Sequence, residues 1–259
     1  MARKLVITSG KGGVGKTTVT ANLGIQLAAK GFKVVLVDAD IGLNNLDVVM
    51  GVENKVSYDV ADVLEGRCKI SQALIRDALY HNLFVLPSTR VNSKKKISGA
   101  EFRLVVDKLK SADFVLIDCP AGIDVGFHRA VCGATEACVV VTPALSSVRD
   151  SDKVLSLLGS YKLESVNLIV NRIRPDLVSR GDMISAGDVS RLLRAPLVGI
   201  IPEDDRIGLC TSLGYVRDRS VAGRAFSVLA DNVIERGNKA FDYMANTKGI
   251  GAIVKRLLG

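Results

Sequence analysis

Short apolar runs alternate with amphipathic segments along most of this 259-residue chain. Seven runs rich in β-branched residues predict strands over residues 5–7, 34–37, 83–86, 114–117, 138–141, 168–170 and 197–200. Helical spacing predicts helices over residues 18–30, 101–109, 150–158 and 222–243. Nearly continuous apolar strands are typical of a sheet buried on both faces. The pattern therefore predicts an α/β fold, a doubly wound and mainly parallel sheet with helices on both faces.

The eight residues Gly10-Lys11-Gly12-Gly13-Val14-Gly15-Lys16-Thr17 have the spacing of a phosphate-binding loop between a strand and a helix. Backbone N–H groups of such a loop, with the helix N-terminus behind it, bind phosphate oxygens. Lys16 is expected to neutralise the β- and γ-phosphates, and the Thr17 hydroxyl to ligate Mg²⁺. Lys11 has no part in this scheme. Either it is a solvated loop side chain, or its glycine neighbours let another chain approach it closely.

Two further predicted strands end in carboxylates. Residues 114–118 have the form of a Walker B element, a buried strand that ends at Asp118. An acid there can hold an Mg²⁺-bound water beside the phosphates. Residues 34–40 form a second acidic strand end, with Asp38 and Asp40. With carboxylates from both strand ends near one Mg²⁺, one would orient water and the other would support the metal shell. Any single strand-end Asp could instead cap a turn.

The bulk composition limits the class of protein. With 48% hydrophobic residues, six prolines and no evident linker, residues 1–246 are predicted to form a single P-loop domain. The net charge of +8, from 35 basic and 27 acidic residues, suits an anionic partner, either nucleic acid or a lipid surface. The five cysteines include no Cys-x-x-Cys pair, so they are interpreted as buried apolar residues. An iron–sulfur cluster on Cys132 and Cys138 is the alternative.

The last residues, 247–259, form a short amphipathic segment. On a helix, the apolar face would carry Ile250, Ile253, Val254, Leu257 and Leu258. Lys248 and Lys255 would project on the opposite side, with Arg256 on the flank. Such a segment is too short to cross a bilayer, and it would lie in the interface with its basic groups near anionic headgroups. Docking on the protein's own core is the alternative.

Several of these segments resemble the ParA/MinD family of ATPases. Residues 11–18, Lys-Gly-Gly-Val-Gly-Lys-Thr-Thr, resemble its deviant Walker A motif, and residues 38–47 resemble its switch I. Residues 118–124 resemble switch II, although Cys119 and Asp124 stand where the family usually has Ser and Glu. Residues 146–152 and Asn171-Arg172 match further segments, so the similarity runs through the whole chain.

The resemblance implies roles for particular residues. Lys11 would reach across a homodimer to the phosphates of the partner chain, like an arginine finger supplied in trans. Asp40 would position the attacking water, and Thr17, Asp40 and Asp118 would surround Mg²⁺. Asn171 would face the adenine edge, because an amide both donates and accepts hydrogen bonds. The implied nucleotide-binding residues are Gly10, Lys11, Gly12, Gly13, Val14, Gly15, Lys16, Thr17, Thr18, Asn171 and Arg172.

The resemblance also implies a function, that of an ATPase which is cytoplasmic and peripheral on the inner face of the cell membrane. It would dimerise with ATP and Mg²⁺, place the division septum, and recruit a MinC-type division inhibitor, with a MinE-type regulator in some lineages. The alternatives are a ParA-type partition ATPase acting on DNA and an ATP-dependent iron–sulfur scaffold. The amphipathic tail favours a lipid partner over nucleic acid.

Overall fold

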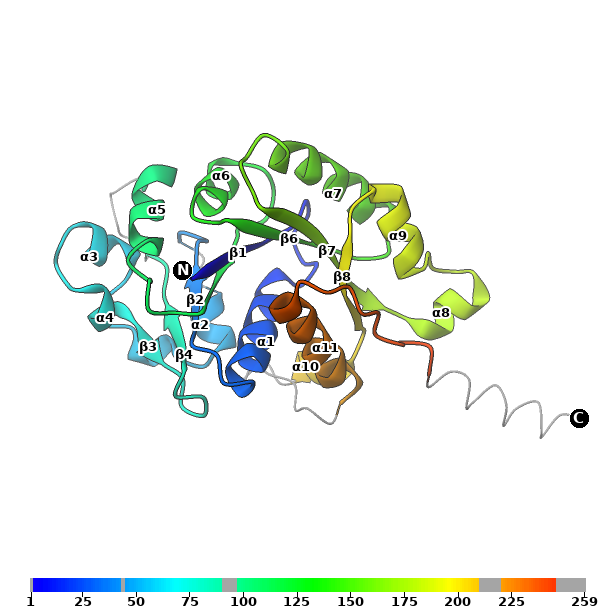
Figure 1. The fold of residues 1–259 in the computed structure, drawn as a ribbon, viewed down its shortest axis with the longest axis horizontal. Coiled ribbons are helices and arrows are strands. Elements are labelled where there is room, and N and C mark those ends of the chain that lie inside the picture. Colours follow the sequence, from blue (N-terminus) through cyan, green and yellow to red (C-terminus); the bar gives the residue numbers. More distant parts are fainter. Residues whose placement is uncertain (1, 43–44, 90–96, 210–219, 246–259) are drawn as a thin grey trace, which may run out of the picture.

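The computed structural model describes residues 2–42, 45–89, 97–209 and 220–245. In these ranges one eight-stranded sheet has the order β3-β4-β2-β5-β1-β6-β7-β8, and every pairing is parallel except that of β3 with β4 (Figure 1). The strands are β1 (Arg3–Thr8), β2 (Val34–Asp38), β3 (Ile75–Arg76), β4 (Leu83–Leu86), β5 (Phe114–Asp118), β6 (Glu136–Val141), β7 (Ser165–Ile173) and β8 (Leu197–Pro202).

Helices cover both faces of this sheet, with α1 and α11 on one side and α5, α6, α7 and α9 on the other (Figure 1). The α-helices are α1 (Lys16–Ala29), α2 (Leu46–Val49), α3 (Val60–Leu64), α4 (Ile70–Ala73), α5 (Gly99–Val106), α6 (Val125–Cys132), α7 (Leu145–Leu158), α8 (Pro175–Arg180), α9 (Ala186–Leu193), α10 (Asp205–Leu209) and α11 (Val221–Glu235). A 3₁₀ turn spans Glu53–Lys55. The doubly wound, mainly parallel sheet predicted from the apolar pattern is confirmed.

The two faces of the sheet carry separate apolar cores, because successive strand side chains point to opposite sides. Leu5 and Leu36 pack with Phe226 of α11 on one face. Val6 packs with Phe127 of α6 on the other. This double burial explains why the strands are apolar at nearly every position.

All seven predicted strands are present, and β3 was not predicted. It is two residues long and pairs antiparallel with β4 at the edge of the sheet. A run this short has no recognisable period. All four predicted helices also begin before their predicted first residues, at residues 16, 99, 145 and 221 instead of 18, 101, 150 and 222. The start of α5 is set by a capping box, in which the backbone N–H of Glu101 donates to Ser98 Oγ and that of Ser98 to the Glu101 carboxylate.

The last described helix is shorter than the predicted segment of residues 222–243. α11 ends immediately before Arg236, which takes a left-handed backbone conformation with φ of 54°. Asn232 then binds the departing chain, since its side-chain oxygen accepts from the Lys239 N–H at 2.9 Å and its amide donates to the Lys239 carbonyl at 2.8 Å. Phe241 packs against both cores instead of continuing the helix. The helical prediction was wrong beyond residue 235.

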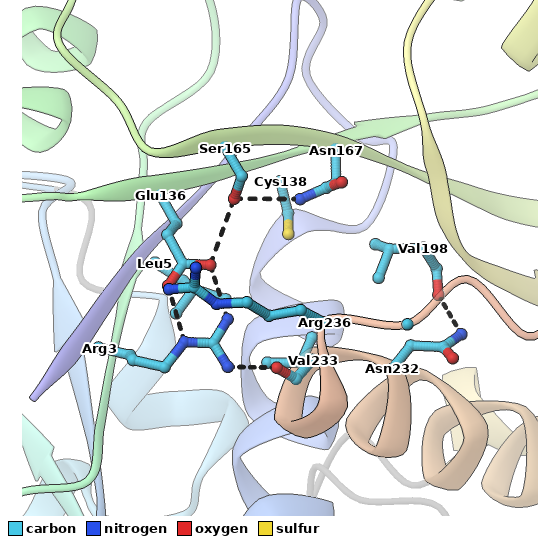
Figure 2. A pocket seen from close by; sticks show the side chains of 11 residues that line it. Arg3, Leu5, Glu136, Cys138, Ser165, Asn167, Val198, Asn232, Val233 and Arg236 are labelled. Atoms are coloured by element: carbon cyan, nitrogen blue, oxygen red, sulfur yellow. Dashed lines mark hydrogen bonds and ion pairs between the residues drawn. The ribbon is translucent and has the colours of Figure 1, made fainter.

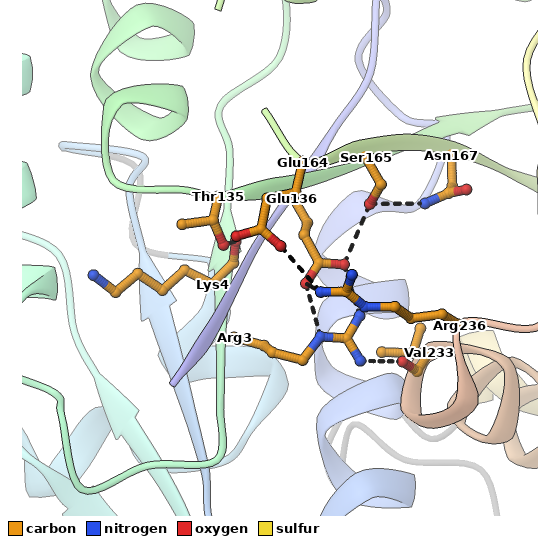
Figure 3. A network of polar contacts seen from close by, with 9 residues as sticks. All are labelled: Arg3, Lys4, Thr135, Glu136, Glu164, Ser165, Asn167, Val233 and Arg236. Carbon is orange, nitrogen blue, oxygen red and sulfur yellow. Dashed lines mark hydrogen bonds and ion pairs between the residues drawn. The ribbon is translucent and has the colours of Figure 1, made fainter. Parts of the chain in front are cut away.

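Charged side chains fasten the end of α11 to the amino ends of the strands (Figure 3). Arg3 donates through Nε and Nη2 to the two carboxylate oxygens of Glu136, at 2.7 and 2.6 Å. Burial by itself would raise the pKa of Glu136, but the hydrogen bond and charge of Arg3 lower it. Arg236 lies 3.0 Å from Glu164 and 3.7 Å from Glu136. Arg3, Glu136 and Arg236 border a cavity of about 120 Å³ (Figure 2), and both arginines pair with Glu136, so this end of the sheet is a structural junction.

We predict opposite effects of the same substitution at two helical glycines. A Cβ at Gly24 of α1 would lie 2.5 Å from Leu36 Cδ2, and Leu36 is fully buried. Gly24→Ala should therefore lower the free energy of unfolding by about 1–3 kcal/mol through overpacking. Gly187→Ala in α9 meets nothing closer than 3.8 Å and should raise it by up to about 1 kcal/mol. Urea denaturation measures both, and stabilisation by Gly24→Ala would contradict the close packing of α1 on β2.

Candidate nucleotide-binding site

The phosphate-binding loop, residues 9–15, joins β1 in the middle of the sheet to α1. Gly13 and Gly15 have φ of 75° and 95°, a left-handed conformation that glycine adopts without strain. Ser9 closes the start of the loop, because its hydroxyl donates to the Lys11 carbonyl at 2.7 Å. The loop thus curls around the N-terminus of α1, where backbone N–H groups and the helix dipole favour an anion.

Two loop glycines are required by packing within the same chain. A Cβ at Gly10 would lie 2.3 Å from backbone atoms of Asp150 in α7, and one at Gly15 would lie 2.5 Å from the amide nitrogen of Asn171. Gly10 therefore serves contact with α7. Gly12 and Gly13 are exposed, and a Cβ at Gly13 would meet nothing within 4 Å. The open part of the loop is the part next to Lys11.

The two lysines of the loop have different surroundings. Lys16, the first residue of α1, is 8% exposed. Lys11 is exposed, and its Nζ lies 3.5 Å from the Ser146 hydroxyl in the first turn of α7. Thr17 and Thr18 are half-buried in the first turn of α1. Lys16 is therefore positioned for a ligand inside the loop, whereas Lys11 stands at its rim.

Asp38 and Asp118 end neighbouring strands, β2 and β5, as register partners. Asp118 is 3% exposed, and burial raises its pKa to about 6 despite hydrogen bonds from Thr17 and Thr20 and the charge of Lys16. The Thr20 hydroxyl lies 3.2 Å from its carboxylate. The predicted metal acid therefore lies beside the loop, linked directly to α1.

Asp38 organises the turn that carries Asp40. Its carboxylate accepts from the backbone N–H of Asp40 at 2.8 Å and of Leu46 at 3.2 Å. Burial first, and the charge of Asp118 second, raise the pKa of Asp38 to about 8. Asp40 itself is half-buried, and burial raises its pKa, opposed by the charges of Lys16 and Arg129. Of the two acids in this segment, Asp40 is the one that solvent reaches.

The donor set fits Mg²⁺ with a nucleotide. The oxygens of Thr17, Asp40 and Asp118 are the hard ligands that this ion prefers. Within the described ranges, no three His, Cys, Asp or Glu side chains form a group that could hold a metal alone. An ion bound here would take its remaining ligands from phosphate oxygens and water, as Mg²⁺ commonly does.

Of the predicted pair on β7, Asn171 reaches the phosphate-binding loop, and no contact places Arg172 there among the described residues. The Asn171 amide donates to the Val14 carbonyl at 2.8 Å, so its side chain supports the phosphate-binding loop. Arg172 has φ of 58° and is exposed, and the pairing of β7 with β8 shifts register there. The strand is irregular where it meets the loop. Contact of Asn171 with adenine stays a prediction.

Cys132 and Cys138 lie on different sides of the sheet. Cys138 belongs to the core that contains α1 and α11. Cys132 ends α6 on the opposite face, next to Gly99 of α5. Burial raises the pKa of the Cys138 thiol to about 12, so it behaves as an apolar side chain. The pair does not form a cluster site.

Four polar residues of the site were missed in the sequence. Thr20 contacts Asp118, Ser9 closes the loop, Ser146 meets Lys11, and Arg129 approaches Asp40. Thr20 lies four residues after Lys16, on the same helical face, and this spacing could have identified it. Arg129 belongs to α6, and only the tertiary fold brings it to the turn after β2.

Comparisons with known proteins agree with this geometry. Residues 5–212 match the CobQ/CobB/MinD/ParA nucleotide binding domain. The chain is 45% identical over 266 residues to the septum site-determining protein MinD of Synechocystis sp., with 100% of both chains covered. It is similar to the structure of a MinC:MinD cell division protein complex from Aquifex aeolicus, with TM-score 0.84, 42% identity and coverage of 90% of this chain and 96% of that one. A further similar structure is the septum site-determining protein MinD complexed with Mg-ADP from Pyrococcus horikoshii OT3, with TM-score 0.80, 34% identity, and coverage of 90% and 96%.

The raised pKa of Asp38 predicts that stability falls as pH rises when nucleotide and Mg²⁺ are absent. Between the ordinary value of 3.8 and the folded value of about 8, the folded chain holds a proton that the unfolded chain has lost. The free energy of unfolding should therefore decrease across this window, by at most about 1.4 kcal/mol per pH unit for one proton.

Asp38→Asn should flatten this slope when urea denaturation is repeated from pH 5 to pH 8, intervals of about one unit being sufficient. Asp188→Asn in α9 is the control. The pKa of Asp188 is lowered by its hydrogen bond from Ser185, so this variant should shift the curve without changing its slope in that range. An unchanged slope in Asp38→Asn would contradict the burial of a protonated Asp38.

Proposed function

Because this chain belongs to the CobQ/CobB/MinD/ParA nucleotide-binding family, and to its septum-site-determining MinD branch, we propose that it binds Mg·ATP, dimerises, and attaches to the membrane in the ATP state. It is an ATPase of division-site placement. The observation that carries the proposal is the contrast between two lysines on one loop. Lys16 is buried beside Asp40 and Asp118, whereas Lys11 is exposed at the rim.

Each residue of the pocket has a physical task in this reaction. The loop N–H groups and Lys16 bind and neutralise phosphate oxygens. Thr17, Asp118 and Asp40 would hold Mg²⁺, which stabilises charge that develops on the phosphates when it is bound. Asp40, the more exposed of the acids in its turn, would also orient the attacking water. Asn171 keeps the loop against β7 through Val14, and its side chain would also contact the base.

A second copy of the chain would complete this site. Among the described residues, the Lys11 ammonium has one hydrogen-bond contact, at 3.5 Å with the Ser146 hydroxyl. Exposed apolar side chains stand around the same rim: Ile123, Val125 and Leu145 are 41%, 74% and 73% exposed. Such a surface favours a partner chain. Lys11 from that chain would add positive charge at the phosphates as negative charge develops.

Membrane attachment would follow from dimerisation. No helix in the described ranges is long and apolar enough to span a bilayer. The predicted targeting segment, residues 247–259, lies outside the described residues. One such short segment binds a surface weakly, and two on a dimer raise avidity by about 10²–10⁴, because the second binding event is intramolecular. ATP would thus control membrane attachment, because the dimer carries two copies of the segment of residues 247–259 and the monomer carries one.

The partners follow the same logic. The similar structure from Aquifex aeolicus is a MinC:MinD complex, so a MinC-type division inhibitor is the proposed binding partner. A MinE-type regulator would act on the same dimer in lineages that possess one. Residues 146–152, in the first half of α7, adjoin Lys11 through Ser146, and partners that bind there would sense the nucleotide.

We predict that alanine substitutions of the two loop lysines have different effects on nucleotide binding and on ATP turnover. Lys16→Ala should abolish detectable binding of ADP and ATP, because it removes the buried phosphate contact. Lys11→Ala should change ADP affinity by less than about threefold but reduce ATP turnover by about 10³-fold or more, the range of a missing charged finger. Calorimetry and phosphate release measure the two quantities. Wild-type turnover in Lys11→Ala, or turnover per chain that persists at high dilution, would contradict a trans role.

We also predict that vesicle binding requires both ATP and the tail. Full-length protein should sediment with anionic phospholipid vesicles in ATP and remain in the supernatant in ADP. A chain lacking residues 248–259 should stay in the supernatant in both. Lys11→Ala is the matched control with an intact tail, and it should behave as the ADP state does. Equal sedimentation in ATP and ADP, or binding that survives tail deletion, would refute the proposal.

A further inference from the structure

Arg129 is the charged residue near the pocket that the proposed reaction does not use. It lies on α6, and its half-buried side chain crosses to the turn after β2. Its Nη2 donates to the Ala39 carbonyl at 3.2 Å, and its Nη1 lies 3.5 Å from the Ile97 carbonyl. The guanidinium therefore joins α6 to the turn that carries Asp40.

The contact with Ala39 controls one peptide plane. The Ala39 carbonyl and the Asp40 N–H belong to the same peptide unit, which is planar. Arg129 binds this unit on the carbonyl side, and the Asp38 carboxylate accepts from its N–H at 2.8 Å. With both polar groups held, the direction in which the Asp40 side chain leaves the backbone is set.

α6 is also joined to the loop after β5. A Cβ at Gly126 in the first turn of α6 would lie 2.6 Å from Pro120 Cγ, so loop and helix are closely packed. The Asp118 carbonyl accepts from the Ala39 N–H at 3.0 Å. A displacement of residues 119–124 would thus reach the turn of Asp40 by two routes, through β5 and through Arg129.

The energetics favour a functional role over a purely structural one. Burial lowers the pKa of Arg129, opposed by the charges of Asp40 and Cys119. Its Nε is buried, with no hydrogen-bond partner among the described residues. A buried donor left in this way has lost its hydrogen bond to water without a replacement, which is not expected of a group that serves stability alone.

We propose that Arg129 is a positioning residue for ATP hydrolysis, because its contacts with Ala39 and Ile97 hold the Asp40 turn against α6 and align Asp40 with the attacking water. This inference rests on the proposed function. It makes the loop of residues 119–124 and α6 the part of the chain that sets the place of Asp40. Arg129 touches no residue of the phosphate-binding loop in the contacts described, so nucleotide affinity should not depend on it.

Arg129→Met, which retains length without charge or donors, is the main test variant. It should lower kcat for ATP hydrolysis by about 10- to 100-fold, the cost of a misplaced catalytic group, while KM and ADP affinity change by less than about threefold. Arg129→Lys should recover most of kcat, because an ammonium can still donate to the Ala39 carbonyl. Arg103→Met in α5 is the matched control, since Arg103 is an exposed arginine, and it should match the wild type.

Hydrogen exchange gives a second readout that does not depend on turnover. In Arg129→Met bound to Mg·ADP, the amides of residues 38–42 should exchange faster than in the wild type, whereas those of residues 9–16 should not. This measurement separates the proposed function from the proposed role of Arg129. If the wild-type protein showed no ATP turnover, the proposed hydrolysis would be wrong. The exchange rates at residues 38–42 would still show whether Arg129 holds the Asp40 turn.

Three results would overturn the inference. They are wild-type kcat in Arg129→Met, unchanged exchange at residues 38–42, and a joint loss of kcat, ADP affinity and stability that Arg129→Lys does not recover. If Arg129→Met does not fold, Arg129→Gln replaces it. Gln keeps an NH2 donor group without the charge, so its kcat should fall below that of Arg129→Lys, and equal values would count against the inference.

Discussion

The burial of two carboxylates at adjacent strand ends is the constraint around which the site is organised. Asp38 and Asp118 are register partners and are 1% and 3% exposed. Loss of water disfavours the charge of each, and their pKa values rise to about 8 and 6. Lys16 and the hydroxyl of Thr20 offset part of this cost for Asp118. A divalent cation at this edge of the sheet would offset more, which couples the acids to a metal nucleotide.

The same constraint explains why Asp40 is separate from its neighbour. Asp38 spends both carboxylate oxygens on backbone N–H groups, including that of Asp40. Asp38 therefore fixes the turn and is closed to solvent. Asp40, two residues further on, is half-buried and lies near Lys16 and Arg129. Asp38 therefore fixes the backbone of the turn, and Asp40 is the acid that solvent reaches.

The rim of the pocket is built differently from its floor. The floor consists of the buried Lys16 and the strand-end acids, and it is complete within one chain. The rim carries the exposed Lys11 and exposed apolar side chains such as Val125 and Leu145. In the proposed function, one chain would bind the nucleotide at the floor, and the exposed rim would bind a second chain, so that ATP would control assembly.

By itself, the sequence determined the class of fold, the loop and the family. Short, nearly continuous apolar runs and spaced helical patterns are local features of the chain, and so is the glycine spacing of the phosphate-binding loop. The seven longer strands, the loop and the place of Asp118 at a strand end were therefore predicted correctly, whereas β3 was missed. Tertiary structure decided what depends on contacts between distant segments. It ended α11 at residue 235, because Arg236 turns the chain and Asn232 binds it there. It also brought Arg129 to the Asp40 turn, since that contact joins residues 90 positions apart in the chain and leaves no local pattern in the sequence.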